Sequence, residues 1–225
     1  MIPLRDTIRA RRFPVVTVSI IVANILIFIF QATLTLPELQ YLVNTFGLVP
    51  ALQIQMFQQA PFSLQTWIPM VTSMFLHGNW FHVLGNMLYL WVFGDNVEDV
   101  LGRGKFLLFY LLAGLAGGLA HVISSPGSLV PTIGASGAVA GVLGAYFVTF
   151  PHARVLALVP LLFIITFMEL PAVLFLFLWI GLQLLNGLIG LAGAQVAWWA
   201  HIGGFAAGMV LIKILLNRTN VFRPT

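Results

Sequence analysis

The sequence predicts an all-α polytopic membrane protein with six transmembrane helices and both termini in the cytoplasm. Three observations predict this fold class. Hydrophobic residues make up 60% of the chain and charged residues only 7%, far below the roughly one quarter that is usual in soluble proteins. Apolar stretches of membrane-spanning length recur along the chain, and the positive charges fall on one side of them.

About 20 consecutive apolar residues are needed to cross a hydrocarbon core of roughly 30 Å. In chain order the predicted spans are 15–34, 81–93 with its preceding turn, 106–123, 136–150, 170–189 and 196–216. The second and fourth are short. The sequence therefore divides into a cytoplasmic N-terminal segment (1–14), a single transmembrane domain (15–216) and a cytoplasmic C-terminal tail (217–225).

The ten lysines and arginines predict the orientation. They precede span 1, lie between spans 2 and 3, follow span 4, and close the chain, while none occurs from Phe13 to Gly102. By the positive-inside rule the termini are cytoplasmic and the long first connection is external. These charges are too scattered to form a nucleic-acid-binding face. Because the chain has no cysteine, disulfides, thiolate metal sites and a cysteine nucleophile are excluded.

Two connections differ from ordinary loops. The long first one is uncharged after Glu38 and rich in apolar residues, so we expect it to lie in the membrane interface. Residues 155–168 are apolar but contain Pro160, and we expect a re-entrant or interfacial piece there. Span 5 is then expected to begin near Pro171, since proline suits the first turn of a helix.

Span 4 is too short to cross the membrane, because about 15 residues rise only about 22 Å. His152 and Arg154 follow its cytoplasmic end, so the other end, which carries Ser136, is predicted to begin inside the membrane. The preceding loop must then dip into the protein, which predicts a wet pocket. His201 lies one turn into span 6, which runs in the same direction, so Ser136 and His201 are expected at one depth.

Small residues follow Ser136 and His201 along the same faces of their predicted helices. Residues three or four apart share a face of a helix, so Ser136, Ala140 and Gly144 form one stripe and His201, Gly204 and Gly208 another. Such stripes let membrane helices approach closely. The glycines expected to pack near the site are Gly134, Gly137, Gly204 and Gly208.

Span 2 descends from the same side and carries His82 and Asn86, four residues apart on one face. The start of span 4 also offers free backbone N–H groups, including that of Ser136, and the positive end of a helix dipole. Fixed donors of this kind can stabilise a developing oxyanion. Packing alone could explain Ser136, and interhelical hydrogen bonds could explain the other polar residues. Their common depth favours function.

These motifs carry a family resemblance. GASG opens span 4, AHIGGFAAG lies in span 6, and HGNWFHVLGNM begins span 2. Together with FGDNVEDVLGRGKFLLFYLLAG, they resemble the rhomboid intramembrane serine proteases, over about residues 46–208.

The resemblance implies a six-helix core of prokaryotic type. Ser136 would be the nucleophile and His201 the general base and acid, with an oxyanion hole formed by Asn86, His82 and the Ser136 N–H. Single-span membrane proteins would be the substrates, cut near the outer face of the bilayer, and span 5 would open to admit them. No cofactor or metal is implied.

The charge pattern predicts a Ser–His dyad without an acidic third member. The acidic cluster Asp95, Glu98 and Asp99 is expected in a cytoplasmic loop, pairing locally with basic neighbours, and Glu169 at the inner start of span 5. Without an orienting carboxylate, turnover should be slow. Two departures from the family stand out. Ala140 replaces an aromatic residue that packs on the histidine in some members, and the first loop has no arginine after Trp67.

Other functions need features that the sequence lacks. A zinc protease needs HExxH, and an aspartyl type needs two intramembrane aspartates. A proton-coupled transporter would show inverted repeats and buried carboxylates. A non-catalytic rhomboid-like protein that binds membrane clients is the main alternative, although such relatives typically lack the serine or the histidine. With no transit or cleavable signal segment recognised, a prokaryotic cytoplasmic membrane is the expected location.

Overall fold

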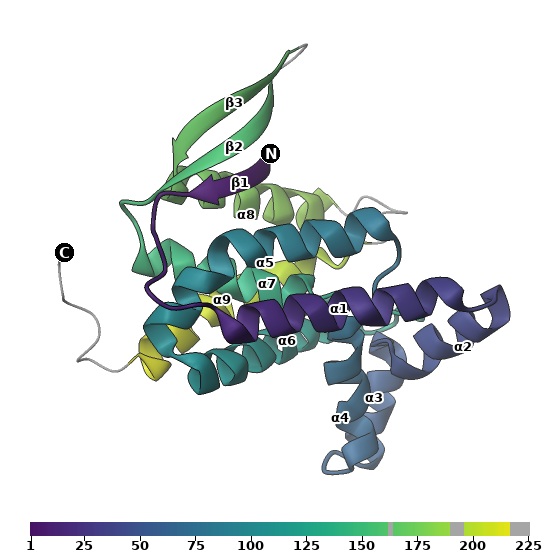
Figure 1. Ribbon diagram of the computed structural model, residues 1–225. Helices are drawn as coiled ribbons and strands as arrows, with labels where there is room; N and C mark the ends of the chain where they lie inside the picture. The colour runs from purple at the N-terminus through teal and green to yellow at the C-terminus, as the bar shows by residue number, and fades with distance from the viewer. Residues whose placement is uncertain (162–163, 190–195, 217–225) are drawn as a thin grey trace.

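Long helices surround a short central helix, and a small sheet stands at one end of the bundle (Figure 1). The computed structural model describes residues 1–161, 164–189 and 196–216. The predicted tail at 217–225 lies outside the described residues. Within the described part, most of the chain is helical.

The described helices are α1 (Val15–Thr33), α2 (Leu36–Phe46), α3 (Pro50–Gln59), α4 (Leu64–Thr72), η1 (Ser73–Phe75), α5 (Trp80–Leu101), α6 (Arg103–Ser124), α7 (Ser136–Thr149), α8 (Ala172–Ile189) and α9 (Trp198–Leu215). The strands are β1 (Ile2–Asp6), β2 (Arg154–Leu161) and β3 (Ile164–Pro171). The first connection, predicted to be interfacial, thus folds into the short helices α2 to α4, which extend to one side of the bundle (Figure 1). Its location in the interface stays a prediction.

Four of the described helices, α1, α6, α8 and α9, are long and apolar enough to cross a membrane. They correspond to predicted spans 1, 3, 5 and 6. The fourth predicted span is the 14-residue helix α7, which is too short to cross a bilayer alone. Helix α5 has 22 residues but carries three carboxylates. The protein is therefore a multi-pass membrane protein, and spans 2 and 4 remain predictions.

Helix α7 is the centre of the bundle. Every residue from Gly137 to Tyr146 is buried, and the helix packs against α5, α6 and α9. A helix that is apolar all round belongs in a protein interior rather than at a surface. The packing of α7 therefore determines which side chains lie next to its first residue, Ser136.

The all-α prediction is wrong at residues 155–161 and 164–168, which form strands. The predicted re-entrant or interfacial location of this segment stays a prediction. Strands β2 and β3 pair antiparallel from Arg154↔Pro171 to Leu161↔Ile164, and β1 adds to the other edge of β2. Val155, Ala157 and Val159 are buried while the residues between them are half-buried, the two-residue alternation of a strand. β1 lies at the N-terminus, far from β2 and β3 along the chain, so no local sequence pattern predicts the sheet. Helix α8 accordingly begins at Ala172, and Glu169 lies in β3, 2.9 Å from Arg154.

Span 2 was predicted to end too early, and its acidic residues do not lie in a loop. Helix α5 continues to Leu101. Glu98 is only 3% exposed and accepts hydrogen bonds from the Val16 and Thr17 N–H groups, at 3.0 and 2.7 Å. Those groups belong to the first turn of α1, where backbone N–H groups lack helical partners. Glu98 therefore caps α1 from another helix, which is not the local ion pairing that was expected.

The contact between α7 and α9 depends on glycines. A Cβ atom on Gly204 would lie 2.0 Å from the carbonyl oxygen of Gly137, and one on Gly208 would lie 1.9 Å from that of Gly141. The two backbones are thus in direct contact, as small residues allow. On α9 the contact is made by the predicted stripe. On α7 it is made by Gly137, Gly141 and Gly144, so the first two contact positions lie one residue after the predicted ones.

Replacing Gly208 by alanine should separate these helices. The added methyl group meets a backbone oxygen that cannot rotate away, so Gly208→Ala should lower the free energy of unfolding by about 1–3 kcal/mol. The matched control is Gly181→Ala on α8, where nothing lies within 4 Å of the added atom and alanine should stabilise the helix slightly. Unfolding in mixed micelles would measure both. Equal stability of the two variants would contradict the close contact.

The N-terminal strand is linked to α7 by a polar cluster. The Asp6 carboxylate accepts a hydrogen bond from the Tyr146 hydroxyl, and another from Asn96 Nδ2 at 2.9 Å. Tyr146 lies near the end of α7 opposite Ser136. Burial raises the pKa of Asp6 to about 6, because a low-dielectric environment disfavours the charged carboxylate.

This shift predicts a pH dependence of stability. The pKa of Asp6 in the folded state is above the unfolded value of 3.8, so the protonated side chain favours the folded state. This contribution to the free energy of unfolding is complete below pH 3.8 and is lost as the pH rises through about 6. Thermal melting of wild type and Asp6→Asn from acidic to neutral pH would test this. The melting temperature of wild type, relative to the variant, should fall over this range and then level off. Parallel curves for the two proteins would refute the assignment to Asp6.

Candidate active site

Two polar side chains meet at the start of the central helix. Ser136 is the first residue of α7, and His201 lies in the first turn of α9. The Ser136 Oγ lies 2.8 Å from His201 Nε2, a normal hydrogen-bond distance. His201 is 8% exposed. The arrangement can pass the hydroxyl proton to the imidazole, which is what activation of a serine requires.

The other nitrogen of His201 contacts a residue that the sequence analysis missed. His201 Nδ1 lies 2.7 Å from the Oε1 atom of Gln183 on α8. Gln183 is itself buried, at 8% exposure. A polar side chain within an apolar membrane helix is unusual enough to have marked it as a candidate.

Two tryptophans flank the His201 ring. The ring of Trp179 on α8 lies 5.8 Å from it, between centroids, and that of Trp198 on α9 lies 6.1 Å away, edge-on. These contacts are within the usual range for aromatic packing. Ala140 has no ring to pack on the histidine, and the aromatic contact comes instead from Trp179 on α8.

Among the residues that the structure describes, His201 has no carboxylate partner. All six side-chain carboxylates of the chain lie within the described residues, and the side-chain hydrogen bonds of His201 there go to Ser136 and Gln183. Asp6, Asp95, Glu98 and Asp99 lie toward the other end of the bundle, with the sheet and the start of α1. The expected two-residue arrangement is therefore compatible with the geometry.

The loop that leads into Ser136 is held by the first connection. Thr132 exchanges two backbone hydrogen bonds with Leu48, at 3.0 and 2.8 Å, and the Gly134 N–H donates to the Ser73 carbonyl at 2.8 Å. Backbone groups inside a membrane protein need such internal partners. The helices of the first connection thus fix the entry into α7.

His82 and Asn86 face this loop at Gly134. A Cβ atom on Gly134 would lie 2.6 Å from His82 Nε2 and 3.7 Å from Asn86 Nδ2. Gly134 also has φ of 129°, which only glycine adopts readily. Both side chains therefore lie beside the residue two positions before Ser136. Asn79 sets their register, because it caps α5 by accepting a hydrogen bond from the His82 N–H at 2.9 Å.

His77 orients the amide of Asn86, and the sequence analysis did not assign it to the site. His77 Nε2 lies 3.0 Å from Asn86 Nδ2, and the Ala135 N–H donates to the same ring nitrogen at 3.4 Å. Since Nε2 accepts both bonds, it carries no proton. His77 is buried and begins HGNWFHVLGNM, the motif that also holds the two candidates His82 and Asn86.

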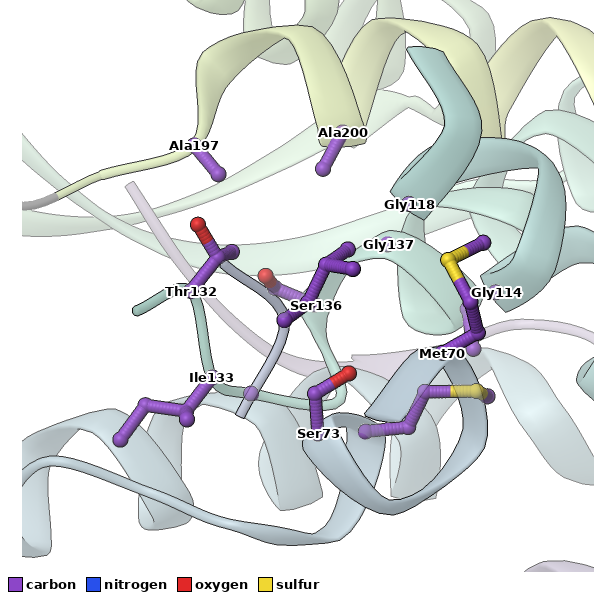
Figure 2. A pocket seen from close by; sticks show the side chains of 14 residues that line it. Met70, Ser73, Gly114, Gly118, Thr132, Ile133, Ser136, Gly137, Ala197 and Ala200 are labelled. Carbon is purple, nitrogen blue, oxygen red and sulfur yellow. The ribbon is translucent and has the colours of Figure 1, made fainter. Parts of the chain in front are cut away.

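A small cavity of about 30 Å³ adjoins the serine. Figure 2 shows the hydroxyl groups of Ser73, Thr132 and Ser136 around it, and Ala197, just before α9, and Ala200 of α9 also line it. A space of this size can hold a water molecule where polar groups are available to bind it. The pocket that the sequence predicted before span 4 thus has a structural counterpart.

Comparison with known proteins gives three informative relatives. Presenilin-associated rhomboid-like protein A, mitochondrial, of Danio rerio is 35% identical over 111 residues, 47% of this chain and 29% of the relative. Rhomboid protein 1, mitochondrial, of Saccharomyces cerevisiae is 36% identical over 96 residues, 41% of this chain and 28% of the relative. Rhomboid protease GluP of Bacillus subtilis is 44% identical over 79 residues, 35% of this chain and 15% of the relative.

The chain thus spans less than a third of the length of these relatives. The rhomboid domain family, in contrast, matches residues 64–218. That match covers more than half of the 225 residues and includes His77, His82, Asn86, Ser136 and His201. The family resemblance seen in the sequence is confirmed: the chain belongs to the rhomboid family.

Proposed function

We propose that this protein is an intramembrane serine endopeptidase that cuts transmembrane segments of other membrane proteins. The observation that carries the proposal is the 2.8 Å contact between Ser136 Oγ and His201 Nε2. A serine next to glycine is common in membrane helices for packing reasons alone. A half-buried serine hydrogen-bonded to a buried histidine, at the N-terminus of a helix, is the arrangement of an activated nucleophile.

The geometry suggests how peptide hydrolysis would proceed. His201 Nε2 takes the hydroxyl proton as Ser136 Oγ attacks the scissile carbonyl, and the carbonyl oxygen becomes an oxyanion. The protonated imidazole then gives its proton to the leaving amine, which leaves an acyl group on Ser136. A water molecule from the adjoining cavity then loses a proton to His201 Nε2 as it attacks the acyl group. The imidazolium returns this proton to Ser136 Oγ as the acyl–oxygen bond breaks, which releases the new carboxyl end and restores the serine hydroxyl.

The oxyanion would be bound by donors that are already in place. We assign this role to the Ser136 N–H, which has no helical partner at the start of α7, and to the side chains of Asn86 and His82. The helix dipole of α7 adds a favourable field. Donors fixed before the reaction stabilise the developing charge without reorganisation.

We further propose that substrates are single-span proteins, cut near the outer face of the bilayer. An extended peptide must reach Ser136, so small or helix-weakening residues at the scissile bond would favour cleavage. The pattern of lysines and arginines supports a topology in which both termini lie in the cytoplasm. We place the protein in a prokaryotic cytoplasmic membrane, whereas two of the relatives above are named as mitochondrial.

Cleavage in liposomes tests the nucleophile and the base. Wild type should cut a single-span test protein with glycine and alanine in its transmembrane segment, whereas Ser136→Ala and His201→Ala should be inactive while melting at similar temperatures. The readout is the appearance of two fragments on a gel. If the folded variants cut as fast as wild type, the dyad is refuted. If wild type binds but does not cut several such proteins, the client-binding alternative is favoured.

Asn86→Ala tests the oxyanion hole. Loss of one such donor should lower kcat by about 10²-fold or more with little change in KM, because the hydrogen bond forms fully only in the transition state. Asn86→Asp, which has the same shape but no N–H donors, should be equally impaired. An unchanged kcat with a lower melting temperature would instead make Asn86 a packing residue held by His77.

A further inference from the structure

Gln183 is an unusual residue for its position. Helix α8 is apolar, and Leu182 and Leu184, its two neighbours in sequence, are 51% and 44% exposed. Gln183 points the other way, into the protein, and is buried. A buried amide is unfavourable unless its hydrogen bonds are satisfied. Its position therefore depends on specific partners, and these lie at the site.

The hydrogen bonds of Gln183 determine the direction of its amide. Gln183 Nε2 donates to the Trp179 carbonyl oxygen, 3.3 Å away. A carbonyl oxygen can only accept, so the NH₂ group must face Trp179 and the Oε1 atom must face His201. The 2.7 Å contact between Oε1 and His201 Nδ1 then requires that Nδ1 carries the proton.

The same argument fixes the other side of the imidazole. With the proton on Nδ1, a neutral His201 has an unprotonated Nε2, which accepts the hydrogen bond of the Ser136 hydroxyl. The four groups form one directed chain, from the serine hydroxyl through the imidazole and the amide to the α8 backbone. Each donor has an acceptor, and reversal of the imidazole tautomer would leave two acceptors facing each other.

We infer that Gln183 is the positioning residue of the dyad: its side-chain carbonyl holds His201 in the tautomer that can accept the proton of Ser136. This inference rests on the proposed serine-protease function. Gln183 acts through His201 and does not touch the reacting atoms. In serine proteases with a triad, a carboxylate in this place fixes the tautomer and stabilises the imidazolium. The neutral amide of Gln183 fixes the tautomer, but it stabilises the positively charged imidazolium less than a carboxylate would.

The positioning group comes from a third helix. Ser136 belongs to α7 and His201 to α9, which are fixed to each other by backbone contact, whereas Gln183 belongs to α8. The orientation of the histidine therefore depends on how α8 rests on α9. The sequence has alanine at position 140, where some family members have an aromatic residue that packs on the histidine. Here Gln183 and Trp179, four residues apart on α8, orient His201 instead.

Three variants separate the acceptor from mere packing. Gln183→Met keeps the length of the side chain but removes the carbonyl oxygen. Gln183→Glu keeps an oxygen acceptor. The matched control is Asn186→Leu, which removes the other amide of α8, one turn further along and half-buried. All are made in the full chain and checked for unchanged melting temperature.

Two readouts are needed. The first is the rate at which a small fluorophosphonate labels Ser136, which requires an activated serine but not the entry of a transmembrane segment. The second is the ¹⁵N spectrum of labelled histidines at mildly alkaline pH, with the His201 signals assigned by their loss in His201→Ala. Wild type should show His201 protonated at Nδ1 alone.

Gln183→Met should label about 2- to 13-fold more slowly, the worth of one neutral hydrogen bond, and its His201 spectrum should show both tautomers. Gln183→Glu should restore both readouts, and Asn186→Leu should match wild type. A Gln183→Met protein that labels at the wild-type rate with a single Nδ1–H tautomer would overturn the inference, as would a Glu variant as impaired as Met.

Failure of the proposed function would look different. If a wild-type protein is not labelled at Ser136, the nucleophile assignment fails whatever Gln183 does. The ¹⁵N spectra still decide whether Gln183 sets the tautomer of His201, because they need no activity. The two hypotheses can therefore fail separately.

Discussion

Backbone contact between α7 and α9 is the constraint on which the rest of the structure depends. Gly137 and Gly141 on one helix meet Gly204 and Gly208 on the other so closely that a single methyl group would collide with a carbonyl oxygen. In a bilayer, helices associate through packing and not through the hydrophobic effect. This contact places the first residue of α7 beside the first turn of α9, so that the 2.8 Å distance from Ser136 to His201 follows from the glycines.

A second constraint is that polar groups in a dry interior need partners. The site meets it with directed hydrogen bonds from Ser136 to His201 to Gln183 on one side and from Asn86 to His77 on the other. Among the described residues, His77 Nδ1 is the exception at the site, since it is buried without a partner. The same rule explains Glu98, whose carboxylate replaces the missing partners of the α1 backbone. It also explains why the loop before Ser136 pairs with Leu48 and Ser73.

The sequence predicted what composition and depth can reveal. The four long apolar helices α1, α6, α8 and α9 were located to within a few residues, and depth arguments placed Ser136, His201, His82 and Asn86 in one region. It missed what depends on pairing between distant segments. The sheet needs β1, which is about 150 residues from β2 along the chain. Glu98 was assigned to a loop because its helical partner lies over 80 residues away, and Gln183 could be linked to His201 only once the packing of α8 was known.

The central claim is that Ser136 is a nucleophile and not a packing residue. The most direct test is to treat the folded wild-type protein in detergent with a fluorophosphonate and to identify the modified residue by peptide mass spectrometry. Ser73 lines the same cavity without a histidine hydrogen bond, so it serves as an internal control. The account predicts modification of Ser136 and not of Ser73, and loss of labelling in His201→Ala. Equal labelling of both serines, or labelling that does not depend on His201, would contradict it.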